Sequence, residues 1–213
     1  MNTSRPHAPA QTKNFSPKAW PLLTALWLIA SFIAWPLNHH SIDWQPALAL
    51  GEPWRAFSAA FVHYSPMHLA ANAVGAVMVG VFGWAAQVPP RMTVAWLIAW
   101  PLTHFGLLLQ PSLLHYGGLS GLLHAGVVIV CVHLMFNGTT SQRRVGAATL
   151  LVVMAKVLTE APWKGALIYP ADWDIAVAPM SHASGVAAGL AAGLVAGLVS
   201  ARQQRAKAKT KLP

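Results

Sequence analysis

A serine flanked by glycines opens a long apolar run at Gly118-Leu119-Ser120-Gly121. Glycines permit a tight turn that leaves a serine hydroxyl and the neighbouring N–H groups uncovered. If a helix begins at Ser120, the positive end of its dipole favours the negative charge that forms when a serine attacks a carbonyl. Small residues in this arrangement also permit close helix packing in membranes. The segment alone therefore leaves two readings open, a nucleophile or a packing site.

A histidine near the C-terminus is the best candidate for a general base. His182 lies three residues before the first of four glycines, so it shares a helical face with them. These glycines are spaced four apart, at Gly185, Gly189, Gly193 and Gly197. Such a stripe favours backbone-to-backbone helix packing. If the partner is the helix that Ser120 opens, His182 comes close enough to accept the serine proton.

A third polar cluster, His68 and Asn72, carries hydrogen-bond donors four residues apart. Residues at this spacing share one face of a helix, so both donors would point to a common spot. Donors arranged in this way stabilise an oxyanion. Interhelical hydrogen bonds are the structural alternative for the same pair.

The composition places these residues in a membrane protein. Of 213 residues, 55% are hydrophobic and 9% are charged, whereas soluble domains carry about 25% charged residues. The net charge of +9 comes from basic residues that are few and scattered among apolar runs, so no nucleic-acid partner is expected. The single cysteine, Cys131, excludes an intrachain disulfide.

The apolar runs predict an all-α, polytopic membrane protein with six transmembrane helices. The expected spans are 19–37, 68–83, 92–109, 119–136, 145–158 and 181–200. They form one membrane domain, 19–200, between an N-terminal tail, 1–18, and a basic tail, 201–213. Residues 38–66 and 160–179 are expected to be loops on one side.

The basic residues predict the orientation. Eleven of the 14 lysines and arginines fall on the side of the termini, so both termini are expected in the cytoplasm. Spans two, four and six then all begin at the outer face. His68, Ser120 and His182 come to the same depth, and a single site opening to that face is predicted.

Four motifs in order resemble the rhomboid family of intramembrane serine proteases. They are Trp54-Arg55, Met67-His68 with Asn72, Gly118-Leu119-Ser120-Gly121, and His182 with Gly185 and Gly189. The resemblance covers residues 19–200 and implies a six-helix rhomboid-like bundle. It implies that Ser120 is the nucleophile and His182 the base. His68, Asn72 and the backbone N–H groups of Leu119 and Ser120 would form the oxyanion site, with Gly118, Gly121 and Gly185 in support.

One position departs from the family pattern. Many rhomboids carry a tyrosine one helical turn after the serine, where it stacks on the catalytic histidine; here the residue is His124. No acidic residue adjoins His182 in sequence, so no third catalytic member is assigned. Lys156 and Glu160, four apart, are interpreted as a structural ion pair.

The short chain, the segment 118–124 and the pair Lys156 and Glu160 are also similar to rhombosortases. These bacterial rhomboids process proteins with a Gly-Gly C-terminal sorting signal. The similarity implies the bacterial inner membrane as the location and single-span membrane proteins as substrates. It leaves the oligomeric state open.

Two alternatives belong to other classes. An inactive rhomboid relative would bind membrane proteins without cutting them, although such relatives usually lack the serine or the histidine. The ten histidines could instead hold haem or metal, but no His-Glu-x-x-His motif or cysteine cluster accompanies them. No cofactor or metal is therefore expected, and His39-His40 is interpreted as an interfacial pair.

Overall fold

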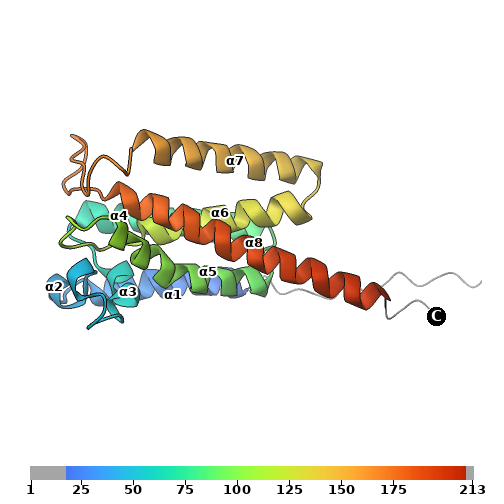
Figure 1. Ribbon diagram of the computed structural model, residues 1–213, viewed down its shortest axis with the longest axis horizontal. Helices are drawn as coiled ribbons and strands as arrows, with labels where there is room; N and C mark the ends of the chain where they lie inside the picture. The colour runs from blue at the N-terminus through green and yellow to red at the C-terminus, as the bar shows by residue number, and fades with distance from the viewer. Residues whose placement is uncertain (1–17, 210–213) are drawn as a thin grey trace, which may run out of the picture.

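The computed structural model describes residues 18–209, and this part of the chain is helical with isolated β-bridges but no strands. The long helices are α1 (Ala19–Ala34), α4 (Pro66–Ala85), α5 (Pro90–Phe105), α6 (Ser120–Asn137), α7 (Thr140–Thr159) and α8 (Pro179–Lys209). They run side by side along the molecule (Figure 1). The all-α membrane fold is thereby confirmed.

Four helical stretches within residues 18–209 are long and apolar enough to cross a membrane. They are Pro66–Ala85, Pro90–Leu109, Ser120–Asn137 and Pro179–Ser200. The apolar helix α1 is shorter, with 16 residues. Helix α7 has 20 residues but includes Arg143, Arg144 and Lys156, so the expected fifth span there stays a prediction.

The ends of the chain only partly test the expected tails. Residues 1–17 of the N-terminal tail lie outside the described residues. Helix α8 continues past the expected boundary at 200 as far as Lys209, and residues 210–213 of the basic tail are again outside the described part.

The segment expected as a loop, 38–66, contains short helices. They are α2 (His39–Ile42), η1 (Pro46–Leu48), α3 (Arg55–Ser58) and η2 (Ala59–Phe61), while η3 (Gly106–Leu109) extends α5. Trp44 exchanges backbone hydrogen bonds of 2.8 and 2.9 Å with Tyr116, which ties this segment to the approach to α6. Helices α4, α6 and α8 all begin at the same end of the molecule as α2 and α3 (Figure 1).

Local signals fix where the site-bearing helices begin. The Ser65 hydroxyl caps α4 by accepting the His68 N–H at 3.0 Å, and Pro66 occupies the first turn, where its missing N–H costs nothing. Pro179 opens α8 in the same way, three residues before His182. Both histidines therefore lie in the first turn of their helices.

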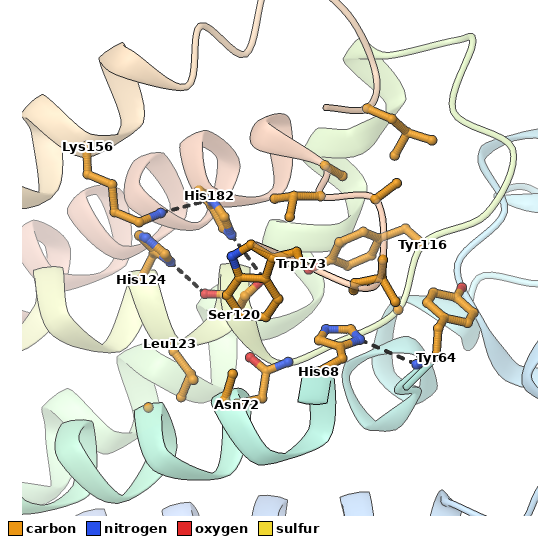
Figure 2. Close-up of a pocket in the computed structure, with 18 of the residues that line it drawn as sticks. Tyr64, His68, Asn72, Tyr116, Ser120, Leu123, His124, Lys156, Trp173 and His182 are labelled. Atoms are coloured by element: carbon orange, nitrogen blue, oxygen red, sulfur yellow. Dashed lines mark hydrogen bonds between the residues drawn. The ribbon is translucent and has the colours of Figure 1, made fainter. Parts of the chain in front are cut away.

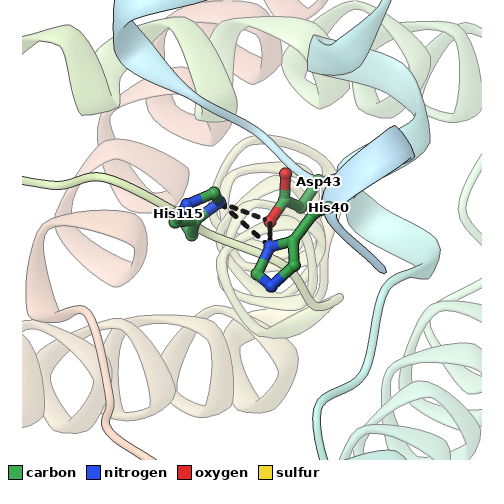
Figure 3. A group of neighbouring side chains, drawn as sticks. All are labelled: His40, Asp43 and His115. Carbon is green, nitrogen blue, oxygen red and sulfur yellow. Dashed lines mark hydrogen bonds and ion pairs between the residues drawn. The ribbon is translucent and has the colours of Figure 1, made fainter. Parts of the chain in front are cut away.

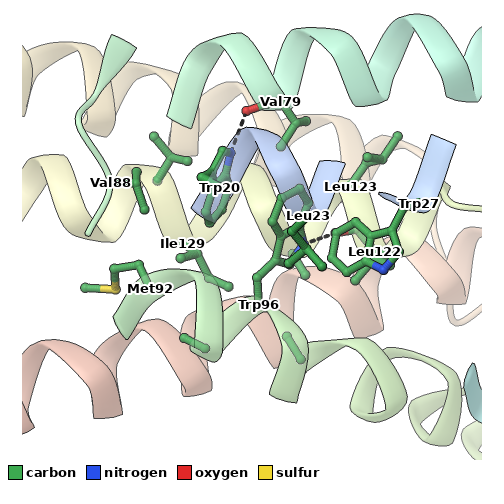
Figure 4. Close-up of a cluster of buried hydrophobic side chains, with 14 of the residues drawn as sticks. Trp20, Leu23, Trp27, Val79, Val88, Met92, Trp96, Leu122, Leu123 and Ile129 are labelled. Atoms are coloured by element: carbon green, nitrogen blue, oxygen red, sulfur yellow. Dashed lines mark hydrogen bonds between the residues drawn. The ribbon is translucent and has the colours of Figure 1, made fainter. Parts of the chain in front are cut away.

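Tryptophans hold the core beneath the site. Trp20 stacks on Trp96 with ring centroids 4.1 Å apart, and Trp27 meets Trp96 edge-on at 4.4 Å (Figure 4). Two of these indole N–H groups are hydrogen-bonded, since Trp20 donates to the Val79 carbonyl and Trp96 to the Leu122 carbonyl, whereas that of Trp27 has no partner within residues 18–209. Helices α1, α4, α5 and α6 are locked together by these contacts.

Candidate active site

The serine and histidine meet at the shared end of α6 and α8. The Nε2 atom of His182 lies 3.1 Å from the Ser120 hydroxyl oxygen, across 62 residues of sequence (Figure 2). Ser120 is the first residue of α6. Its hydroxyl is thus positioned by a helix start, next to N–H groups that have no partner within the helix.

The glycine stripe explains this short distance. A Cβ at Gly185 would lie only 1.9 Å from the Gly121 carbonyl oxygen, and one at Gly189 would lie 2.6 Å from that of Ala125. Gly121 in turn faces the backbone of Ser181. Gly121 and Gly185 therefore let the two helix backbones touch directly behind the serine.

Although no acidic residue adjoins His182 in sequence, one contacts it in the folded protein. Glu160, the residue that caps the C-terminal end of α7, places Oε2 2.6 Å from His182 Nδ1. Its Oε1 accepts a hydrogen bond of 2.6 Å from Lys156. The pair interpreted as structural is therefore in direct contact with His182, and Lys156 Nζ lies 3.3 Å from the same Nδ1.

This contact fixes the tautomer of His182. A carboxylate can only accept, so Nδ1 carries the hydrogen and donates it to Glu160. Nε2 is then free to accept the Ser120 hydroxyl hydrogen. Burial alone would raise the pKa of the Glu160 carboxyl, but the hydrogen bond and charge of His182, together with Lys156, lower this pKa to about 2. Glu160 is thus ionised at neutral pH.

His124 occupies the position one turn after the serine. Its ring stacks on His182 with centroids 4.3 Å apart and planes at 20°. Its Nδ1 lies 2.7 Å from the Ser120 carbonyl oxygen, to which it donates (Figure 2). The imidazole therefore presents a flat face to His182 and is itself held against the backbone.

His68 and Asn72 approach the serine from α4. The backbone N–H of Tyr64 donates to His68 Nδ1 at 3.4 Å, so the ring hydrogen resides on Nε2. The Asn72 side-chain nitrogen is buried and has no hydrogen-bond partner within residues 18–209. Both side chains point toward the serine (Figure 2). Each offers a donor to a group bound there.

Gly118 makes room for these donors. Its φ of +123° lies in the region that favours glycine, and a Cβ there would sit 2.6 Å from His68 Nε2 and 3.3 Å from the Asn72 nitrogen. The next residue, Leu119, is the N-cap position of α6, with its side chain fully buried. Gly118 thus sets the turn that delivers Leu119 and Ser120 to the site.

A cavity of about 530 Å³ contains the assembled groups. Its walls come from α4, α6, α7 and the segment that precedes α8. The polar residues at its floor are His68, Asn72, Ser120, His124, Lys156 and His182. The remaining lining is largely apolar, including Met78, Leu123, Val127 and Val153, and Trp173 and Tyr116 also line the cavity. The cavity thus places apolar surface beside the Ser120 hydroxyl.

Sequence reasoning missed Glu160 as the partner of His182, and Tyr116 and Trp173 as cavity walls. One feature of the sequence could have indicated this contact: Glu160 was expected at the outer end of the fifth span, at the same level as His182. Nothing in the spacing indicates how the segment 161–181, which separates Glu160 from His182, folds back. The set Ser120, His182 and Glu160 can perform acyl transfer by a nucleophile, a base and an orienting carboxylate.

A comparison with known families gives one match. The family model described as the Rhomboid domain matches residues 50–198. This range includes all the site residues described above: His68, Asn72, Ser120, His124, Glu160 and His182. No curated protein matches the chain.

Proposed function

The chain belongs to the rhomboid family of intramembrane proteases, and from this premise we propose that it is an active serine endopeptidase. The observation that carries the proposal is the chain of short contacts from Ser120 Oγ through the His182 ring to Glu160. An inactive relative has no need of a serine that is hydrogen-bonded to a correctly protonated histidine.

The reaction begins with transfer of the Ser120 proton to His182 Nε2 as the serine oxygen attacks the substrate carbonyl. Glu160 holds the ring through Nδ1–H and stabilises the imidazolium that forms. His182 then donates its Nε2 proton to the leaving amine. A water molecule that loses its proton to the same nitrogen hydrolyses the acyl-enzyme and regenerates the serine.

The oxyanion formed in both steps is stabilised by His68 Nε2–H, the Asn72 amide and the N–H groups at the start of α6. The support is the orphaned Asn72 donor and the His68 tautomer, because both donors are present before substrate arrives. Lys156 has a different part. It pairs with Glu160 Oε1 and limits the charge that the carboxylate presents to His182.

The substrate we propose is a transmembrane protein, cut near the outer end of its helix. The cavity beside the serine is mostly apolar and extends between α4 and α6, which suits a segment that arrives from the bilayer. Both termini are proposed to be cytoplasmic, with the site at the periplasmic face of a bacterial inner membrane. Reporter fusions at Gly138 and Asp172 should then report opposite sides.

A Gly-Gly motif before the substrate helix is the sharper proposal, based on the similarity to rhombosortases. Glycines weaken a helix and expose the carbonyl that Ser120 must reach. A reporter with Gly-Gly at this place should be cut faster than one with Leu-Leu. Equal processing of the two would refute the glycine requirement and leave the general protease proposal intact.

The decisive experiment compares variants of the site residues, reconstituted in liposomes with a transmembrane reporter. Ser120→Ala should abolish both cleavage and labelling by a fluorophosphonate, and His182→Ala should nearly abolish both. His68→Ala and Asn72→Ala remove one donor each, so cleavage should slow by up to about 10²–10³ with the serine still reactive. Each variant must first show native helicity and a native thermal transition. Full cleavage by a folded Ser120→Ala would end the protease proposal.

A further inference from the structure

A second cluster of reactive side chains lies outside the dyad, at the outer rim of the cavity. It consists of His40 in α2, Asp43 directly after α2, and His115 in the segment that leads to Ser120 (Figure 3). The Nδ1 atom of His115 lies 2.9 Å from Asp43 Oδ2. The Nδ1 atom of His40 lies 3.3 Å from the same oxygen and 3.3 Å from His115 Nδ1. Three potential ligand atoms thus form a small triangle.

The triangle has the dimensions of one face of a zinc coordination shell. Bonds of about 2.0–2.1 Å in a tetrahedral arrangement place ligand atoms about 3.3 Å apart. Two of the three observed separations equal this spacing, at 3.3 Å each, and the third is shorter, at 2.9 Å. Two imidazole nitrogens and one carboxylate oxygen are also a ligand set that zinc accepts.

Hydrogen bonds alone do not satisfy this triangle. If both Nδ1 atoms carry hydrogen and donate to Asp43 Oδ2, the two donor nitrogens lie only 3.3 Å apart and share this oxygen with the Tyr64 hydroxyl. If His40 Nδ1 is instead a lone pair, it faces the carboxylate oxygen at 3.3 Å with no hydrogen between them. Either tautomer leaves one unfavourable edge. A cation at the centre makes all three atoms ligands and removes the conflict.

The carboxylate is already held in the orientation that a metal site requires. Asp43 is fully buried, and its Oδ1 accepts a hydrogen bond of 2.8 Å from Gln45. Arg55 bonds the Asp43 carbonyl at 2.9 Å, and Tyr64 donates its hydroxyl to Oδ2 at 3.2 Å. Partners that orient a ligand raise metal affinity. Arg55 also lies 3.5 Å from Oδ1, so Oδ2 is the carboxylate oxygen that faces the two histidines.

The open side of the triangle faces solvent. The side chain of His40 is 67% exposed and that of His115 is 41% exposed. An ion can therefore enter without unfolding, and a water molecule can take the fourth position.

We propose that His40, Asp43 and His115 bind a zinc ion. This ion would link the segment 38–66 to the segment that precedes Ser120. His115 is followed by Tyr116, which exchanges two backbone hydrogen bonds with Trp44 and donates its hydroxyl to the Gly118 carbonyl at 3.3 Å. A metal at His115 would thus fix the segment whose end, Gly118, forms the turn at the oxyanion donors. No sequence pattern predicts this site, because His115 lies 72 residues after Asp43.

The first test titrates the full-length, chelator-treated protein in detergent with Co²⁺, using a purification tag without histidine. The wild type should bind one Co²⁺ per chain with the visible absorption of a tetrahedral ion, and Zn²⁺ should displace it. His40→Gln and His115→Gln should weaken binding by more than about 10–100-fold, the loss that removal of an outer-shell partner alone carries elsewhere. His39→Gln is the matched control in the same helix and should bind like the wild type.

Two further readouts keep the test independent of proteolysis. Zinc should raise the thermal midpoint of the wild type and of His39→Gln, but not that of His115→Gln. X-ray absorption spectroscopy at the zinc edge of the wild type should show two imidazoles and oxygen ligands at about 2.0–2.1 Å. Absence of stoichiometric binding, unchanged binding by folded His40→Gln and His115→Gln, or a shell with more than two imidazoles would each overturn the proposal.

Discussion

Replacement of Glu160 by glutamine isolates the electrostatic part of the contact with His182. Gln has the same shape and its side-chain oxygen still accepts the Nδ1–H, so the ring keeps its tautomer and place. The negative charge is lost, and with it the hydrogen bond from Lys156, because the amide NH2 takes the place of Oε1. Lys156 then remains 3.3 Å from Nδ1 with no carboxylate between the two cations in the transition state.

The size of the effect follows from the distances. A carboxylate and an imidazolium about 4 Å apart attract by about 4 kcal/mol at an effective dielectric constant of 20. Since about 1.4 kcal/mol corresponds to a tenfold change in rate, the upper limit is about a thousandfold loss. Lys156 already offsets part of the charge, and the Glu160 side chain is 17% exposed. We therefore expect kcat to fall by about 10²–10³ with little change in KM.

A double variant separates charge from shape. Lys156→Gln with Glu160→Gln removes both charges, so the repulsion of the imidazolium disappears and part of the activity should return. The assay is cleavage of the transmembrane reporter in liposomes, with fluorophosphonate labelling as the independent measure of serine reactivity. A folded Glu160→Gln with wild-type kcat would refute the role of Glu160. A double variant no faster than Glu160→Gln would refute the electrostatic explanation and leave only an orienting role.

Three other substitutions test separate contacts. His124→Tyr should retain appreciable cleavage, because a tyrosine ring can stack on His182 in the same way, whereas His124→Ala should reduce cleavage; wild-type rates for the alanine variant would mean that His124 only packs. Gly118→Ala should lower kcat by up to about 10²–10³ through displaced donors. Gly165→Ala should not, because its added Cβ would come no closer than 4.0 Å to another atom, the Leu167 carbonyl oxygen; equal rates for both variants would separate Gly118 from the oxyanion site. Burial lowers the pKa of His63 to about 4, below its ordinary 6.5, so the folded state favours the neutral imidazole. As pH falls from 6.5 toward 4, the unfolded state binds the proton first, and the contribution of His63 to stability is lost. His63→Leu should therefore lose less of its thermal midpoint between pH 7 and pH 5 than the wild type, and an identical loss would contradict the burial argument.

The helical fold could be predicted from sequence because the bilayer imposes it. Apolar runs of about 20 residues have few alternatives in a membrane. The expected beginnings of the second, fourth and sixth spans, 68, 119 and 181, lie within two residues of the observed starts of α4, α6 and α8. The spacing of the glycines after His182 also indicated correctly that α8 would contact α6.

Loop-borne contacts could not be predicted in this way. Glu160 reaches His182 through the irregular segment between α7 and α8, and His115 reaches Asp43 across 72 residues. Periodicity carries no information on such segments, because their paths depend on side chains that meet only after the helices have assembled. The short helices within 38–66 were missed for the same reason, since each is a single turn fixed by its neighbours.

The glycine stripe also explains why the close approach of α6 and α8 occurs at the site rather than along the whole pair. Added Cβ atoms would meet backbone at 1.9 Å from Gly185 and 2.6 Å from Gly189, but only side chains at 3.5 Å from Gly193 and nothing within 4 Å of Gly197. The helices therefore touch at the ends that carry Ser120 and His182 and separate toward the other end, although the spacing of four is unchanged. Since His182 and Ser120 lie in the first turns of these helices, the tightest packing sets the distance between His182 Nε2 and the Ser120 hydroxyl. The same small residues thus permit both interpretations of the sequence at once, because close packing is the means by which His182 and Ser120 are brought together.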